Sequence, residues 1–158
     1  MNKLSPKSGF KLSPQTSNNS ALTVYASGTA YALTNTAALL DFGTTDPSLT
    51  ITQPGTYLIL ARAELDYNGA TFAASRTVTL KLRRTNNTAA DITNSPLVAK
   101  TEVTTTVTAT FGDFVLPPVI YTTANNNDII QIFGDVDTVP TAGSLDASSA
   151  DIIAIRLT

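Results

Sequence analysis

The clearest pattern in the chain is an alternation of apolar and other residues over positions 56–67. Side chains at alternate positions of a β-strand point to opposite faces, so the pattern predicts one long strand with a buried face. The other face begins apolar, at Leu58 and Leu60, and then becomes charged. Turn-forming dipeptides flank the run, Pro54-Gly55 before it and Asn68-Gly69 after it. The six residues predicted to face the core are Tyr57, Ile59, Ala61, Ala63, Leu65 and Tyr67.

A second alternating run covers residues 75–85 and places Val78, Leu80 and Leu82 on one face. Because only a short loop separates the two runs, we expect them to form a β-hairpin. The remaining chain consists of short apolar or Thr-rich stretches between turn signals, without helical periodicity, and residues 135–149 read as a long loop. We expect the final stretch, 151–158, to lie inside a sheet. The sequence thus predicts an all-β, antiparallel two-sheet domain over residues 21–158.

Residues 1–20 differ from the rest, because they are polar and contain Pro6 and Pro14. Such a segment buries too little apolar surface to offset its own ordering entropy. Two interpretations stay open: a tail without fixed structure, and an extended arm that orders on a partner. The contacts expected of a docking arm are Lys3, Lys7, Phe10, Lys11 and Leu12.

Composition removes several classes of chemistry. The chain has no Cys and no His, which excludes disulfides, Ser-His-Asp and Cys-His catalysis, and His or Cys zinc sites. Charged residues make up 14% and the net charge is −2, so no basic surface indicates nucleic acid or an acidic membrane. The basic start lacks an apolar region behind it, so we expect no secretory signal and synthesis in a cytoplasm. We expect neither enzymatic activity nor a cofactor.

Carboxylates are the remaining candidates for chemistry. Glu64 and Asp66 share a strand face, as a glycosidase pair would require if it lay in a cleft. The interpretation that we favour is a solvated strand end that pairs with Arg62, or with Lys81 and Arg83 across the hairpin.

The acidic residues near the last loops suit calcium through their oxygen atoms, but their spacing is not that of an EF-hand, and we favour ordinary solvated loops as their explanation. They are Asp128, Asp135, Asp137 and Asp146. A recognition surface, with or without calcium, would consist of the loops around Asn125, Asn126 and Asn127 and around Asp135 and Asp137.

Leu58 and Leu60 raise a separate question, because they point away from the predicted core. Either early segments of the chain cover them or a second subunit does, since exposed apolar patches commonly mark interfaces.

The order of segments resembles the C1q/TNF-like jelly roll. An apolar segment at 38–42 precedes a short strand, Gly55-Thr56-Tyr57 opens the long strand, and an apolar strand closes the domain. The resemblance covers residues 21–158 and implies trimers that bind partners rather than catalyse. Similar modules occur in bacteriophage virions as decoration, head-fibre or receptor-binding parts.

Our leading hypothesis is therefore a non-enzymatic virion component, a homotrimer docked by its N-terminal arm on a capsid or similar assembly. The alternative is a carbohydrate- or receptor-binding module of a phage tail or host-attachment structure.

Overall fold

The computed structural model describes residues 21–43, 45–101 and 106–157. These residues form eleven β-strands. The strands are β1 (Leu22–Ala32), β2 (Ala38–Leu39), β3 (Ser48–Ile51), β4 (Gly55–Thr71), β5 (Arg76–Arg84), β6 (Ala90–Asp91), β7 (Leu97–Thr101), β8 (Val107–Val115), β9 (Val119–Thr123), β10 (Asp128–Val136) and β11 (Ala142–Arg156). The predicted arm, residues 1–20, lies outside the described residues.

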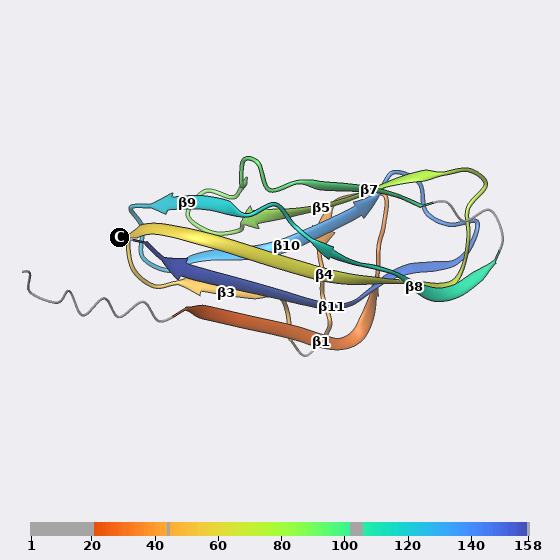
Figure 1. The fold of residues 1–158 in the computed structure, drawn as a ribbon, viewed down its shortest axis with the longest axis horizontal. Coiled ribbons are helices and arrows are strands. Elements are labelled where there is room, and N and C mark those ends of the chain that lie inside the picture. The colour runs from red at the N-terminus through yellow and green to blue at the C-terminus, as the bar shows by residue number, and fades with distance from the viewer. Residues whose placement is uncertain (1–20, 44, 102–105, 158) are drawn as a thin grey trace, which may run out of the picture.

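The strands form two antiparallel sheets (Figure 1). Sheet A has the order β1-β11-β4, and the far edge of β4 pairs with both β8 and β9. In sheet B, β10 pairs with β2, β3 and β5, and β5 pairs with β6 and β7. The two-sheet antiparallel sandwich predicted from the sequence is thus confirmed.

The pairing is nested, as it would be in one long hairpin rolled into a sandwich. β1 pairs with β11, β2 and β3 with β10, β4 with β8 and β9, and β5 with β6 and β7. This order makes the sandwich a jelly roll. β11 lies between β1 and β4, so the expectation of an internal last strand is correct.

The core lies between the sheets and contains the residues that alternation predicts. All six predicted positions of β4 are buried, and Ile59, Ala63 and Leu65 have no exposed surface. Leu80 and Leu82 of β5 face them from sheet B. Each fully buried Leu or Ile contributes about 1.5–3 kcal/mol to the free energy of unfolding, so this face is the main source of stability.

The predicted hairpin of β4 and β5 is wrong, because the two strands lie in different sheets. Residues 72–75 carry the chain from sheet A to sheet B. Lys81 and Arg83 therefore have no access to Glu64. The ammonium of Lys81 instead binds Asp91 at 2.7 Å, on the outer side of sheet B.

The predicted long loop at 135–149 is also wrong, because β10 continues to Val136 and β11 begins at Ala142. This part of β11 is built from small residues, such as Ala147 and Ala150, which fit between β1 and β4. Gly143 has φ +63°, and a Cβ there would lie 2.3 Å from the backbone oxygen of Asn68. Close backbone approach thus explains a composition that is typical of loops.

Candidate functional site

The outer face of sheet A carries a contiguous apolar surface near the end where β1 begins and β11 ends. We call it the outer patch. The register places Leu58 of β4 between Ile120 of β9 and Ile155 of β11, and Leu60 opposite Ile153 of β11. Leu58 and Leu60 are half-buried, whereas Ile120 is 61% exposed. Three adjacent strands thus contribute to one apolar surface.

No described segment of the chain lies over this patch. β1 extends sheet A edgewise through its pairing with β11, and its Ala26 is buried in the core. Tyr25, which is 62% exposed, remains on the outside of the same strand. The early strand β1 is therefore beside the patch rather than above it. Whether a second subunit covers Leu58 and Leu60 stays a prediction.

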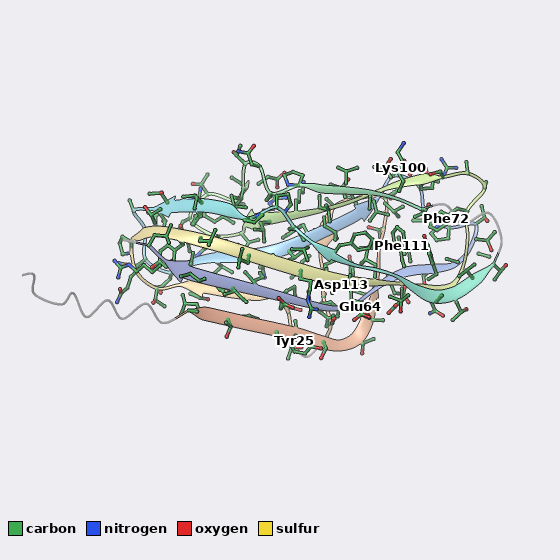
Figure 2. The ribbon with its side chains drawn as sticks, viewed as in Figure 1. Tyr25, Glu64, Phe72, Lys100, Phe111 and Asp113 are labelled. Carbon is green, nitrogen blue, oxygen red and sulfur yellow. The ribbon has the colours of Figure 1, made fainter. Side chains whose placement is uncertain are left out.

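A charged row separates the outer patch from the polar half of the same face. The guanidinium of Arg62 binds Asp151 of β11 at 2.8 Å and Asp113 of β8 at 3.1 Å. Glu64 follows on β4 and accepts a hydrogen bond from the hydroxyl of Ser149 at 3.2 Å. Figure 2 shows Glu64 and Asp113 beside each other on this face, and they are register partners. Arg62, which was expected to pair with Glu64 or Asp66, forms its ion pairs elsewhere.

Neither of the two hollows described here among residues 21–43, 45–101 and 106–157 is lined by both Glu64 and Asp66. Asp66 lines a hollow of about 380 Å³ farther along sheet A, but Glu64 does not. A glycosidase needs both carboxyl groups against one bound sugar. The arrangement of Glu64 on an open sheet face favours the solvated strand over the catalytic pair.

Asp128 forms a buried cluster at the start of β10. Its carboxylate is fully buried and accepts hydrogen bonds from Thr123 at 2.5 Å, Tyr121 at 2.6 Å and Asn87 at 2.9 Å. Burial alone would raise the pKa of Asp128, but these hydrogen bonds and the charge of Arg84 together hold it below its usual value. Tyr121 and Thr123 belong to sheet A and Asp128 to sheet B, so the cluster ties the two sheets together.

The predicted recognition residues do not form one surface. Asn125, Asn126 and Asn127 make an exposed turn between β9 and β10. Asp135 lies within β10, opposite Thr79, and Asp137 follows that strand and accepts a hydrogen bond from the backbone of Thr77 at 3.0 Å. Since a strand rises about 3.3 Å per residue, the two groups are more than about 20 Å apart. The calcium candidates are dispersed in the same way.

Within the described ranges, there is no group of three or more acidic, His or Cys side chains placed to hold a metal ion. Likewise, no helix among these residues is long and apolar enough to cross a membrane. Sequence reasoning missed one feature, the hollow in which Asp146 of β11 lies opposite Asp66 of β4. Eighty residues separate the two, and only the register of the finished sheet brings them together.

No protein-family model matches the chain, and no curated protein matches it significantly. Solved structures give low-identity similarities. The globular domain of zebrafish complement 1qA protein is 16% identical over 87% of this chain and 97% of that chain, with a TM-score of 0.45. Eiger TNF from S. frugiperda is 11% identical over 87% of this chain and 93% of that chain, also at 0.45.

A structure of infectious bursal disease virus, Gx strain, is 13% identical over 86% of this chain, with a TM-score of 0.46. This chain spans about a third of that one, 32%. Identities and TM-scores this low leave the fold assignment to the strand pairing described above.

Proposed function

We propose that this chain is a non-enzymatic structural component of a bacteriophage virion. It acts as a trimeric jelly-roll capsid decoration or head-fibre-type protein, docked on a capsid or similar assembly through residues 1–20. The observation that carries the proposal is the outer patch. A sandwich needs only its inner faces to be apolar, so a second apolar face calls for a second covering surface.

Another copy of the same chain fits this patch. The chain is low in charge and has no disulfides, so contacts between subunits are a natural source of further stability. Closed cyclic assemblies bury the same surface in every copy and leave none exposed. The number three comes from the resemblance to C1q/TNF-like domains.

The position of β1 supports docking through the N-terminal segment. β1 begins at the end of the sandwich where β11 ends (Figure 1). The outer patch lies at the same end, because Leu58 pairs with Ile155 near the end of β11. In a trimer built on this patch, the three β1 strands therefore begin at one end of the assembly. Three weak arms on one particle bind far more tightly together than singly.

A matched pair of substitutions tests the subunit interface. Ile120 on edge strand β9 and Val98 on edge strand β7 are 61% and 60% exposed, on opposite sheets. We expect light scattering to give three times the 16.6 kDa chain mass for the wild type and for Val98→Asp. Ile120→Asp should give the monomer mass with an unchanged circular dichroism spectrum. A monomeric wild type, or a trimer that survives Ile120→Asp, would contradict the interface.

Deletion of residues 1–20 tests docking. Full-length and truncated protein are each sedimented with parent particles that lack this component. We expect the truncated protein to keep its trimer mass and melting temperature and to stay in the supernatant. Equal sedimentation of both proteins would place attachment in the β-sandwich, and a large loss of melting temperature would place residues 1–20 in the folded core.

A second candidate is a carbohydrate- or receptor-binding module of a phage tail. A hollow of about 240 Å³ favours it, because Tyr121, Thr122 and Asp91 line that hollow and offer an aromatic ring beside polar groups. Glycan-array binding that depends on Thr122 or the turn at 125–127, and not on residues 1–20, would replace the first proposal with this one.

A further inference from the structure

The hollow of about 380 Å³ lies on the outer face of sheet A, on the far side of Arg62 from the outer patch. β4, β8 and β11 form its base. Asp66 of β4 is the register partner both of Asp146 on β11 and of Thr110 on β8. Asn68, two residues farther along β4, lines the same hollow. Four oxygen-bearing side chains thus converge on one surface depression.

Asp146 is buried although it belongs to an outer face, with 6% of its surface exposed. The pairing of β1 with β11 shifts register between Ser27 and Tyr31, and Ala30 in this irregular segment lines the hollow beside Asp146. One oxygen of Asp146, Oδ2, accepts a hydrogen bond from the side-chain amide of Asn68 at 3.2 Å. The other, Oδ1, is buried and has no hydrogen-bond donor among the described residues. Buried polar atoms in native proteins nearly always have a partner, so this oxygen indicates a missing one.

The charge around the hollow favours a cation as the missing partner. Like charges directly opposite each other on antiparallel strands are destabilising, and here Asp66 faces Asp146. The nearest base on this face, Arg62, is engaged by Asp113 and Asp151. In the part of the chain that the structure describes, neither Asp66 nor Asp146 forms an ion pair with Lys or Arg.

We propose that Asp66 and Asp146 bind a divalent cation, with Ca²⁺ preferred over Mg²⁺. Carboxylate, amide and hydroxyl oxygens are the hard ligands that both ions take, and Asn68 and Thr110 supply the last two kinds. Ca²⁺ accepts six to eight ligands in irregular geometry and completes its shell with water, whereas Mg²⁺ requires a near-octahedral set. With two carboxylates, the expected Kd is on the order of 10⁻⁴–10⁻³ M. This site does not depend on the proposed virion role.

Terbium luminescence gives a direct test, because the chain has no Trp, and because Tyr67, whose ring lies on the core side of β4, is next to Asp66 and borders the hollow. Excitation of tyrosine in the full-length protein should sensitise Tb³⁺ emission, which CaCl₂ displaces at lower concentration than MgCl₂. We expect Asp146→Asn and Asp66→Asn each to weaken Ca²⁺ competition at least about tenfold, since each removes a charged ligand. The matched control is Asp113→Asn, because Asp113 is an exposed aspartate on the same face outside the hollow. This substitution should change the Ca²⁺ concentration needed for competition less than about threefold.

Thermal melting provides a readout that does not involve terbium. At 10 mM CaCl₂, ten times a Kd near 1 mM, the wild-type melting temperature should rise on the order of 3–5 °C, and Asp146→Asn should show no rise. Without calcium, Asp146→Asn should melt no lower than wild type, because it removes a repulsion and keeps the shape of the side chain. Absence of sensitised emission and of a calcium shift in wild type overturns the proposal. An equal calcium response in wild type and Asp146→Asn also overturns it, and assigns the response to general surface charge.

Discussion

Asp128 and Asp146 are both removed from water, with 0% and 6% of their surfaces exposed, yet their surroundings differ. Both oxygens of Asp128 accept hydrogen bonds, Oδ2 from Tyr121 and Thr123 and Oδ1 from Asn87. Asp146 has one donor for Oδ2 and none for Oδ1 within the described chain. Burial by itself therefore does not distinguish a carboxylate whose hydrogen bonds are complete from one that lacks a partner. The number of donors around each oxygen does.

The two sites also differ in what their neighbours contribute. Asp128 starts a strand after a short turn, so Tyr121 and Thr123 of the preceding strand reach it from a few residues away. Asp146 lies deep in sheet A, and its partner across β4 is Asp66. A carboxylate with three hydrogen-bond donors stabilises the contact between the two sheets. Two carboxylates opposite each other repel instead, and a positive charge between them would relieve that repulsion.

The largest expected effect comes from introducing a carboxylate into the apolar core, where no hydrogen-bond donor is available to it. Ile59 of β4 is fully buried in the apolar core. Ile59→Asp should prevent folding, because an unpaired buried charge costs several kcal/mol against a typical total of about 5–15 kcal/mol. Ile59→Val is the control and should lower the free energy of unfolding by only about 0.5–1.5 kcal/mol. Circular dichroism melting measures both, and a cooperative wild-type-like melt of Ile59→Asp would show that the core face is assigned wrongly.

The next largest effect is expected from removing the carboxylate of Asp128, which accepts hydrogen bonds from three side chains. Asp128→Ala should lower the free energy of unfolding by about 2–4 kcal/mol, because it leaves the hydroxyls of Tyr121 and Thr123 without their acceptor. Asp128→Asn keeps the shape and one acceptor oxygen, so its cost should be smaller. Urea denaturation compares the two variants. A cost for Asp128→Ala below about 1 kcal/mol would mean that solvent replaces the cluster and that it does not hold the sheets together.

Acid should weaken the same hydrogen-bonded cluster to a smaller extent, by protonating Asp128. The folded-state pKa of Asp128 is depressed, so its carboxylate stabilises the fold above the unfolded-state value, near 3.8. That contribution is lost as the pH falls below about 4 toward the lower folded-state pKa. The free energy of unfolding of wild type should therefore fall more steeply between about pH 5 and pH 2.5 than that of Asp128→Asn. Parallel pH profiles of the two proteins would remove Asp128 from the acid sensitivity.

The sequence predicts the core residues well where a strand has one buried face and one solvent-exposed face. β4 and β5 show this, because their alternation has the period of a strand. Alternation identifies the buried face but not the sheet, which is why the two strands were paired wrongly. β11 was missed between 142 and 149 because Ala, Ser and Gly fill a narrow space between two strands there, and these residues are also typical of loops.

The candidate sites are predicted unevenly for the same reason. Leu58 and Leu60 stand out as apolar residues on the wrong face of one strand, which is a local signal. The pairing of Asp66 with Asp146 is not local, because it depends on a register with bulges on both sides of it. A shift of one residue would place Asp146 on the inner face. Such a site becomes visible only when the sheet is assembled.

The smallest expected effect is at Glu64, which shares strand and face with Asp66 but lies outside the hollow. Its carboxylate accepts one hydrogen bond, from the hydroxyl of Ser149. A Gln side chain offers the same acceptor, so Glu64→Gln should change the free energy of unfolding by less than about 0.5 kcal/mol. It should also keep the calcium-dependent rise in melting temperature, whereas Asp66→Asn, two residues away, should lose it. A calcium ion bound in the hollow should depend on a carboxylate in its coordination shell and not on one beside it. Equal loss in both variants would therefore mean that the melting temperature responds to the negative charge of the whole face.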